Sequence, residues 1–573
     1  MLRNHSVFEQ LRNQFSRAEA LPQLIALGLM AGLLTGIVIC GFRLCVDYGQ
    51  MYLLPSGKHE DFESLPSFDA FLLPIMGSIL LGLLLFKLKP HERRTGPVHV
   101  LERMGYHQGR LPLINLVVQF VGGSIALISG HSVGREGPSI HLGAGVSSLA
   151  GQQLGLSSNT LRLLVGCGTA ASIAAAFNTP LAGVIFAMEV VMLEYTVAGF
   201  LPIVAAAVAG DLVVRLTLGA EIDLTHSVLP LSTIDNLPYI IVIGLFTGVL
   251  ATVFSKLLET TVTHVKLPII VKLLLAGLIA GGCAFITPQI MGVGYDTLAD
   301  TIQGNFTLIL IAAILVAKLC VTPITLGLGV PGGLIGPSFL IGALAGALVG
   351  GLIGSNDSPL GYYAMIGMAA MTAALLHAPL AALVALLELT DSPYIILPGM
   401  IAIVVSCLVN QHFFKRPSVF LTSLRALGLD YRYEPITQTL LRQSVLDVMS
   451  SRFIQLGQHI PHEFDGHLLS QHDWVLLKND DEQMFALSPV DLVNFLTTYT
   501  GDQEIDLMKL PAFRADLIAI ASSASLYDAL HEMDKHHVDM AYVASSQGLP
   551  MGIVTRSQIQ ASYQTFSPSP SNK

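Results

Sequence analysis

One glutamate, Glu136, stands in an otherwise apolar stretch and directly precedes a Gly-Pro pair, Gly137-Pro138. Proline is pre-set for the start of a helix, and glycine lets a ligand approach the backbone closely. The first turn of a helix carries unpaired N–H groups and about half a positive charge, which suits an anion. Glu136 can itself take the anion's place until it is protonated or displaced. The pattern predicts an anion-binding helix start with a titratable gate; a loop ion pair between Arg135 and Glu136 is the plain alternative.

The same helix start occurs a second time, which makes an internal duplication the firmest inference. The segment GREGPSIHLGA over 134–144 aligns without a gap with GLIGPSFLIGA over 333–343, an offset of 333 − 134 = 199. The same offset maps Pro-Leu-Ala over 180–182 onto 379–381, and Glu189 onto Glu388. Two helix starts that face one another would bind an anion without Lys or Arg, whereas the alternative is that both are only tight helix starts.

The elements that position these helix starts are expected to cross a membrane. The chain has 52% hydrophobic and 12% charged residues, whereas soluble proteins have roughly 25% charged residues. A helical span needs about 20 apolar residues, and such runs occupy 21–54, 68–88, 112–130, 198–219, 236–257, 269–288, 307–326 and 393–411. Shorter, interrupted segments occupy 137–154, 160–176, 179–192, 334–352, 361–373 and 378–390. Broken segments in corresponding halves are typical of repeat-built transporters and channels.

The charge distribution predicts further domains around this membrane part. Residues 415–573 carry 30 of the 70 charged side chains, which indicates a separate soluble tail. Residues 1–20 read as an amphipathic helix with arginines rather than as a signal peptide. By the positive-inside tendency both ends face the cytoplasm. We therefore expect a membrane domain over 21–426 with repeats at about 70–219 and 269–411.

Other classes of function find no support in these residues. The six cysteines stand singly in apolar runs and read as buried thiols, so no metal site is expected. The net charge of −10 is spread over the whole chain, which argues against nucleic-acid binding. No catalytic constellation is present, so an enzyme is not predicted.

The motifs Gly134-Arg-Glu-Gly-Pro138 and Gly333-Leu-Ile-Gly-Pro337, with the doubled Pro-Leu-Ala segments, resemble the CLC chloride channels and chloride/proton antiporters. The resemblance spans roughly residues 20–426. It implies an all-α polytopic membrane fold, an inverted repeat of broken helices, and a homodimer in lipid with one anion path per subunit. It also implies that Glu136 is the gating glutamate. Backbone N–H groups around Arg135–Gly137 and Leu334–Ile335 would line the chloride sites.

Two departures from the family pattern concern the central chloride site. The family loop Gly-Ser-Gly-Ile-Pro is replaced by Arg94-Thr-Gly-Pro-Val98, so Thr95 would supply the hydroxyl. The family's central tyrosine falls at Phe420, which removes a phenolic donor. The loss of one hydrogen bond amounts to about 1 kcal/mol.

A third departure concerns proton coupling. Many antiporters of the family carry an inner proton-relay glutamate directly after the position of Glu189, where this chain has Val190. The resemblance therefore favours a passive chloride channel that is gated by voltage and pH. The alternative is a chloride/proton antiporter whose protons pass through Glu136 and Glu189, although Glu189 also reads as a structural carboxylate mirrored by Glu388. A remote alternative is a tail-regulated cation channel, which would need acidic groups or carbonyls along its pore.

The tail over 436–566 resembles a pair of CBS domains, with a degenerate first copy. The order of helix, strand, strand and helix is clearest over 525–556. In nucleotide-binding CBS domains a Ser/Thr-x-x-Asp motif contacts phosphate and ribose, and Ser488 and Asp491 keep that spacing. The resemblance implies an adenine nucleotide such as ATP as a ligand, while the alternative is a structural dimerisation module. No cofactor is required for transport. Residues 567–573 read as disordered.

Overall fold

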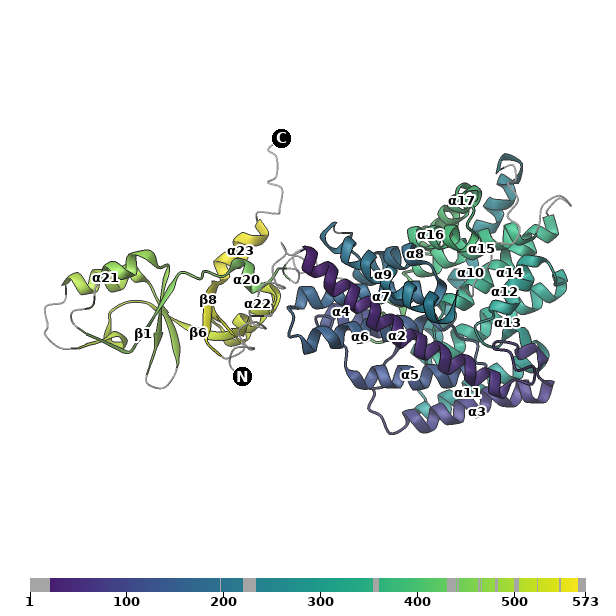
Figure 1. The fold of residues 1–573 in the computed structure, drawn as a ribbon, viewed down its shortest axis with the longest axis horizontal. Helices are drawn as coiled ribbons and strands as arrows, with labels where there is room; N and C mark the ends of the chain where they lie inside the picture. The colour runs from purple at the N-terminus through teal and green to yellow at the C-terminus, as the bar shows by residue number, and fades with distance from the viewer. Residues whose placement is uncertain are drawn as a thin grey trace. The chain divides into compact units, whose positions relative to one another are not determined.

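The computed structural model describes residues 21–195, 197–219, 233–353, 360–429, 440, 443–461, 464, 466–479, 483–498, 504–522, 524–545 and 548–564. They form two compact units, a helical one within 21–429 and an α/β one from 440 onward (Figure 1). The predicted amphipathic helix over 1–20 and the predicted disordered end over 567–573 lie outside the described residues.

The helices of the first half recur in the same order in the second half, close to the offset of 199. The first series is α3 (Ser67–Leu85), α4 (Gly96–Tyr106), α5 (Leu113–Ile128), α6 (Glu136–Gln153), α7 (Ser158–Phe177), α8 (Pro180–Phe186) with the π-helical η2 (Ala187–Met192), and α9 (Val197–Leu218). The second series is α11 (Ile269–Ile286), α12 (Tyr295–Gln303), α13 (Leu308–Gly327), α14 (Ile335–Ile353), α15 (Leu360–Leu376), α16 (Pro379–Thr390), and α17 (Ile396–Cys407) with the π-helical η5 (Leu408–Phe413). Short 3₁₀ turns are η1 (Phe62–Ser64), η3 (Pro288–Ile290) and η4 (Pro393–Ile395).

A further helix precedes each series, so each structural repeat begins earlier than the predicted starts at about 70 and 269. These helices are α2 (Leu21–Leu53) and α10 (Thr233–His264). Each packs on the last helix of its own series, α2 on α9 and α10 on α17. In both contacts the backbones of the two helices approach closely. A Cβ on Gly32 would lie 2.8 Å from the Cα of Ala206, and a Cβ on Gly244 would lie 2.8 Å from the carbonyl oxygen of Ala402. The short helix α18 (Val419–Ala426) ends the unit.

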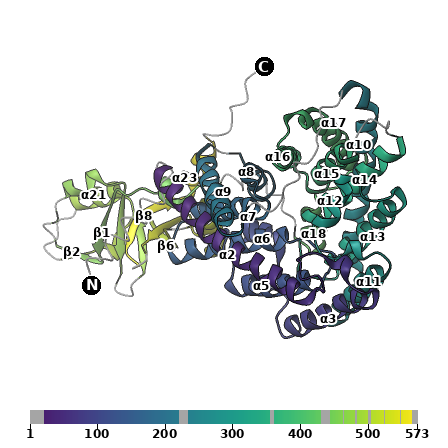
Figure 2. The same cartoon turned by 45° about the vertical axis from the view of Figure 1, so that its right-hand side comes forward.

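The two halves of the helical unit stand beside each other and run in opposite senses. Figure 2 shows α2, α5, α6, α7 and α9 gathered on one side and α10, α13, α14 and α15 on the other, while α3 lies with α11. Gly134 and its repeat equivalent Gly333 pair as an isolated antiparallel β-bridge. A residue pairs with its own equivalent only at a local two-fold axis. The duplication in the sequence is therefore an inverted repeat in space.

The structure corrects the interpretation of two interrupted segments and the length of one span. Among the described residues, nine helices are long and apolar enough to cross a membrane. They include α7 and α14, which the sequence predicted at nearly the same bounds, 160–176 and 334–352, but as interrupted segments. Their most apolar windows are 89% and 83% buried inside the protein. Their glycine and alanine residues serve close packing rather than helix breaking. Conversely, the run at 112–130 forms only the 16-residue helix α5.

The outer helices present apolar side chains where lipid would lie. Leu83 of α3, Leu216 of α9 and Val316 of α13 are each more than 60% exposed. A chain that shows such faces on most of its long helices is suited to a bilayer. Cys45 and Cys320 are exposed on this surface and Cys283 and Cys407 are half-buried, so the prediction of buried thiols holds only for Cys40 and Cys167. The outer face of a membrane helix is apolar without being covered by protein.

The C-terminal unit contains a six-stranded sheet in the order β1-β3-β4-β6-β7-β8. Its strands are β1 (Phe453–Gly457), β3 (Trp474–Lys478), β4 (Met484–Leu487), β6 (Arg514–Ala521), β7 (Met540–Ala544) and β8 (Pro550–Thr555), and a separate pair is β2 (His459–Ile460) with β5 (Ile505–Asp506). The helical segments are α20 (Val445–Val448), η6 (Gly466–Gln471), α21 (Pro489–Thr498), η7 (Leu507–Lys509), α22 (Leu526–His536) and α23 (Arg556–Gln564).

The C-terminal unit is itself a duplication. In each half the first strand pairs in parallel with the second, and the second pairs antiparallel with the third: β1, β3 and β4 in one half, β6, β7 and β8 in the other. A helical segment follows the first strand and a helix follows the third in both halves. The segment around α20 packs into the core of the second half, where Val445 donates its backbone N–H to Ala524. A mixed α/β fold for the tail is therefore confirmed.

Candidate anion gate

Glu136 begins α6 and is fully buried, yet its carboxylate is bound by groups from the opposite repeat. One oxygen, Oε2, accepts a hydrogen bond from the backbone N–H of Gly336 at 3.0 Å, in the first turn of α14. The other, Oε1, accepts a hydrogen bond from the phenolic O–H of Tyr295, the first residue of α12. The carboxylate thus lies on a helix N-terminus, where an anion is favoured.

Arg135 does not pair with the neighbouring carboxylate. Its guanidinium lies 4.9 Å from the centre of the Tyr295 ring and is buried, with 7% of the residue exposed. In the described part of the chain Arg135 and Glu136 form no ion pair, so the alternative of a loop ion pair does not hold. The guanidinium adds positive charge to the same neighbourhood.

The two helix starts meet across the two-fold axis and leave no room for side chains. Gly134 and Gly333 exchange two backbone hydrogen bonds of 2.7 Å each. A Cβ on Gly137 would lie 2.5 Å from the Cα of Gly333, and one on Gly336 would lie 2.5 Å from Val293 Cγ1 and 3.1 Å from both Glu136 oxygens. The glycines of the motif are required by this approach of two backbones.

The prolines of the motif occupy a slightly different place from the predicted one. Pro138 is the third residue of α6 rather than its first. Proline is tolerated throughout the first turn, because the N–H groups there have no intrahelical partner. Pro180 and Pro379, by contrast, are the first residues of α8 and α16.

The structure also brings together the elements of the predicted inner chloride site. Thr95 caps α4, and its side chain makes no capping hydrogen bond. Phe420 is buried in the first turn of α18, and α18 packs on α4. Phe420 offers no hydrogen-bond donor there.

Gln119 of α5 is a buried polar residue that the sequence analysis did not single out. Its Oε1 accepts a hydrogen bond of 2.7 Å from the backbone N–H of Gly96, in the first turn of α4. This bond fixes the orientation of the amide, and its Nε2 is buried without a partner. A Cβ on Gly123 would lie 3.2 Å from this Nε2 and 3.3 Å from Pro138, which places the orphan donor beside the start of α6. A polar residue in the middle of an apolar span was the signal that could have found it.

Glu189 and Glu388 make symmetric contacts across the axis. Glu189 accepts hydrogen bonds from the backbone N–H groups of Leu380 and Ala381, at 3.3 and 2.8 Å. Glu388 accepts the equivalent bonds from Leu181 and Ala182, at 3.0 and 2.7 Å. Glu189 therefore caps the start of α16, and Glu388 caps the start of α8.

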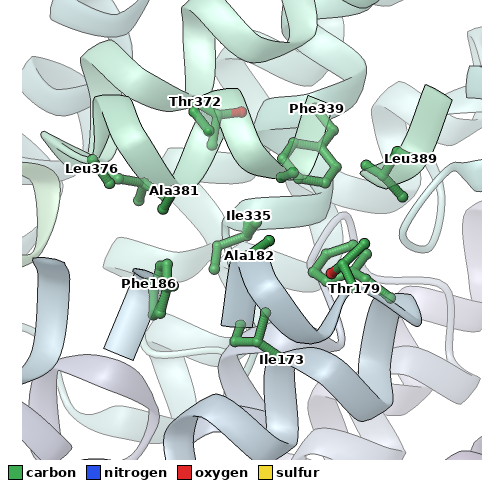
Figure 3. A pocket seen from close by; sticks show the side chains of 14 residues that line it. Ile173, Thr179, Ala182, Phe186, Ile335, Phe339, Thr372, Leu376, Ala381 and Leu389 are labelled. Carbon is green, nitrogen blue, oxygen red and sulfur yellow. The ribbon is translucent and has the colours of Figure 1, made fainter. Parts of the chain in front are cut away.

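A small cavity lies on the axis between these caps and the gate. It measures about 30 Å³ and is lined by α7, α8, α14, α15 and α16. Figure 3 shows side chains of the two repeats facing each other across it, with Thr372, Leu376 and Phe339 opposite Ile173 and Phe186. Ile335, next to Gly336, and Ala381, which binds Glu189, both line it. The space suits about two water molecules, though its walls are mostly apolar.

In the C-terminal unit, Ser488 directly precedes α21 and Asp491 lies in the first turn of that helix. Both are half-buried. In the second half, Thr555 and Gln558 bond reciprocally, with Thr555 donating its backbone N–H to Gln558 Oε1 at 2.9 Å and Gln558 donating its own to Thr555 Oγ1 at 3.2 Å. An open groove of about 460 Å³ crosses β4, β6 and β7, and neither Ser488 nor Asp491 lines it.

An inverted repeat of membrane helices with two facing helix starts and a carboxylate between them defines an anion-transport fold. The model of the voltage gated chloride channel family matches residues 77–411, and the chain belongs to this family of channels and transporters, which are not enzymes. It is a multi-pass integral membrane protein that transports anions.

Curated relatives and solved structures agree with this assignment. The chain is 31% identical over 417 residues to a putative ClcB-like chloride channel protein of Ralstonia nicotianae, covering 70% of this chain and 96% of that protein. It is 29% identical over 412 residues to the voltage-gated ClC-type chloride channel ClcB of Escherichia coli O157:H7, covering 69% and 97%.

Two solved structures share the fold. One is a slow cyanobacterial Cl⁻/H⁺ antiporter, with a TM-score of 0.62 and 24% identity, covering 72% of this chain and 99% of that chain. The other is a eukaryotic CLC transporter, with a TM-score of 0.57 and 19% identity, covering 94% of this chain and 98% of that chain.

Proposed function

We propose that the protein conducts chloride passively through a path that Glu136 closes, and that voltage and protons open it. The observation that carries this proposal is the bond between the Glu136 carboxylate and the N–H of Gly336. A carboxylate at a helix start competes with chloride for the same donors. Protonation removes its charge and weakens this bond. Because a charge that crosses the membrane field gains about 2.3 kcal/mol per 100 mV, voltage acts on the same group.

Chloride would be bound by backbone groups of both helix starts, at Arg135 and Gly137 where α6 begins and at Leu334 and Ile335 where α14 begins. Further in, Thr95 would donate its hydroxyl while Phe420 lines the site without a donor. Gln119 Nε2 is the donor that we add to this inner site. It is buried, unpartnered and adjacent to Pro138, so an anion held there would satisfy it.

Two observations favour a channel over an antiporter. Val190 cannot carry a proton at the position of the family's inner relay. Glu189 is held by two backbone N–H groups, and Glu388 mirrors it, which supports a capping role for both. The antiporter remains the second candidate because a cavity with room for water is lined both by Ala381, whose amide binds Glu189, and by Ile335, which precedes Gly336 at the gate.

Purified full-length protein in chloride-loaded liposomes tests the proposal. Anion efflux is expected, and current carried by cations would instead favour the cation channel. The reversal potential under a pH gradient separates the two mechanisms: no shift is expected for the channel, and a shift would establish proton coupling. Glu136→Gln is expected to leave efflux independent of pH, whereas an unchanged pH response would remove Glu136 from the gate.

The tail is proposed to be a regulatory CBS pair that binds an adenine nucleotide through Ser488 and Asp491. Support comes from the repeated strand-helix-strand-strand-helix order and from the eukaryotic transporter structure, whose alignment extends over 94% of this chain. Equilibrium binding of labelled ATP to the full-length protein tests it. Asp491→Asn is expected to weaken binding, and an absence of binding to the unmodified protein would favour a purely structural module.

We also propose a homodimer in the lipid bilayer with both chain ends in the cytoplasm. The proposal follows from the family's architecture and from the arginines near both ends of the membrane domain. The mass of the protein in detergent, corrected for bound detergent, tests the dimer. Accessibility of cysteines introduced after residue 440 to an impermeant reagent, in sealed cells, tests the topology.

A further inference from the structure

We propose that Tyr295 is a positioning residue that latches the gate: its phenolic O–H holds the Glu136 carboxylate in the closed position and sets the pH at which the path opens. This inference rests on the proposed gating role of Glu136. The two helix starts of the motif supply one contact to that carboxylate, from Gly336, and Tyr295 supplies the other.

The position of Tyr295 follows from the inverted repeat. The offset of 199 maps Gly96, in the first turn of α4, onto Tyr295, the first residue of α12. The start of α4 lies beside the predicted inner chloride site. The two-fold axis therefore places the start of α12 at the corresponding point on the opposite side of the gate. At the first of these points Gly96 donates its backbone N–H to Gln119, and at the second the side chain of Tyr295 donates its hydroxyl to Glu136.

The loop before Tyr295 is anchored from two sides. Lys318, buried in α13, donates hydrogen bonds to the carbonyl oxygens of Ile290 and Gly292, at 2.9 and 3.0 Å. Gly292 in turn donates its N–H to Gly130 at 3.3 Å, in the segment that leads to the gate. Gly294 then turns the chain with a φ of 86°, a conformation that favours glycine. The latch is thus fixed relative to the gate.

The ring of Tyr295 is held as firmly as its backbone. Arg135 covers one face at 4.9 Å, and Phe177 packs edge-on with ring centres 6.3 Å apart. A ring fixed on these contacts presents its O–H to Glu136 without losing further side-chain entropy, which makes the hydrogen bond effective.

Several charged groups act on the same carboxylate. Arg135 directly precedes it, Glu60 lies in the connection between α2 and α3, and Lys318 approaches from α13, while Asp296, next to Tyr295, acts on Glu60 and Lys318. Asp47 of α2 also acts on Glu60 and Arg135. The latch differs from all of these because it makes a direct, directional bond to the carboxylate. Removing its hydroxyl changes no charge.

A hydroxyl that donates to a carboxylate stabilises the ionised form more than the protonated one. Loss of the donor therefore raises the proton affinity of the gate and lets it open at a higher pH. In Tyr295→Phe both ring contacts remain possible, so only the hydrogen bond is lost. We expect the midpoint of the pH dependence of chloride efflux to rise by about one unit, or about tenfold in proton affinity.

A matched control is Tyr363→Phe, because the Tyr363 hydroxyl is also buried and donates to Asn236 Oδ1 at 2.7 Å, on α15 and away from the gate. This variant is expected to keep the wild-type midpoint. In a Glu136→Gln background, Tyr295→Phe is expected to change nothing further, since the bond to an ionised gate no longer exists. Site-specific incorporation of difluorotyrosine at 295, a more acidic donor, is expected to lower the midpoint and so moves it in the opposite direction.

The outcomes separate this inference from the proposed function. If wild-type protein shows no anion efflux, or if Glu136→Gln keeps the pH response, the proposed function itself fails. If Glu136→Gln abolishes the pH response but Tyr295→Phe and difluorotyrosine both leave the midpoint in place, the gate stands and the latch is refuted. An equal shift in Tyr363→Phe would also refute it, because the effect would then be a general one on packing.

Discussion

Gly134 and Gly333 donate their backbone N–H groups to each other's carbonyl oxygens at 2.7 Å. They are equivalent residues of the two repeats, so the two-fold axis of the helical unit passes between them. The two helix starts are thereby held within backbone contact, and Glu136 of one reaches Gly336 of the other. A change in either glycine motif is therefore expected to act on both repeats at once.

Gly336→Ala is expected to open the gate. The added Cβ would lie 2.5 Å from Val293 Cγ1 and 3.1 Å from both Glu136 oxygens, so it pushes the carboxylate away by a few tenths of an ångström and disturbs its hydrogen bond to the Gly336 N–H. Complete loss of a hydrogen bond to a charged group would correspond to roughly tenfold more efflux at neutral pH, so an increase of up to that size is expected. Gly282→Ala is the control, because nothing lies within 4 Å of a Cβ at that position of α11. Equal efflux from the two variants would contradict the assignment of Gly336 as the binding partner of the gate.

Glu189→Gln and Glu388→Gln are expected to behave alike. Each removes the charge from a carboxylate that caps the other repeat's helix, so each is expected to lower the thermal unfolding midpoint through a loss of about 1 kcal/mol. Neither should change the reversal potential under a pH gradient. A change in proton coupling confined to Glu189→Gln would favour the antiporter and a relay role for that residue.

The connection between α2 and α3 carries two carboxyl groups with a raised pKa. Burial raises the pKa of Glu60 from 4.5 to about 7, partly opposed by Arg135, and burial together with Asp296 raises that of Glu63 to about 7. A raised pKa means that the folded protein holds these protons more tightly than the unfolded chain does. The contribution of these two groups to the free energy of unfolding is therefore fully present below pH 4.5, and this contribution is lost as the pH rises through about 7.

This linkage is measured by the thermal unfolding midpoint in detergent as the pH rises from acid to neutral. Glu60→Gln is expected to flatten the decline, because the amide stays neutral throughout. Glu532→Gln is the control, since the Glu532 side chain is 42% exposed in the C-terminal unit, beside Lys535. An equally steep decline in Glu60→Gln and wild type would show that the Glu60 carboxyl ionises freely.

Gln119→Leu is expected to reduce chloride efflux. The change removes the acceptor of the Gly96 N–H and the orphan Nε2 donor together, and each lost hydrogen bond contributes about 1 kcal/mol. Gln119→Glu keeps an acceptor for Gly96 but replaces the donor with an oxygen, so it is expected to impair chloride passage further. Fluxes of both variants are compared at equal protein density in the liposomes. Unaltered efflux in Gln119→Glu would exclude a role for Nε2 in the anion path.

The amino-acid sequence alone determined the duplication, its offset and the chemistry of the two helix starts. These features are local: a Gly-Pro pair within a few residues, a glutamate beside it, and apolar runs long enough for a bilayer. The constant offset of 199 residues also predicted correctly that the helices of the second half follow the order of those in the first half. The segments of α7 and α14 were wrongly predicted as interrupted. Their glycines and alanines allow close packing on neighbouring helices, and composition alone does not reveal those neighbours.

Only the tertiary structure decided which groups meet Glu136. Tyr295 is 159 residues away and Gly336 is 200 residues away along the chain, and no local pattern connects either to the gate. The contacts arise because the two repeats pack in opposite senses about an axis through Gly134 and Gly333. Likewise, the hydrogen bonds that the Glu189 carboxylate accepts from the amides of Leu380 and Ala381 exist only because the two repeats pack together. Spacing along the chain specifies each half, and the packing of the halves specifies the site.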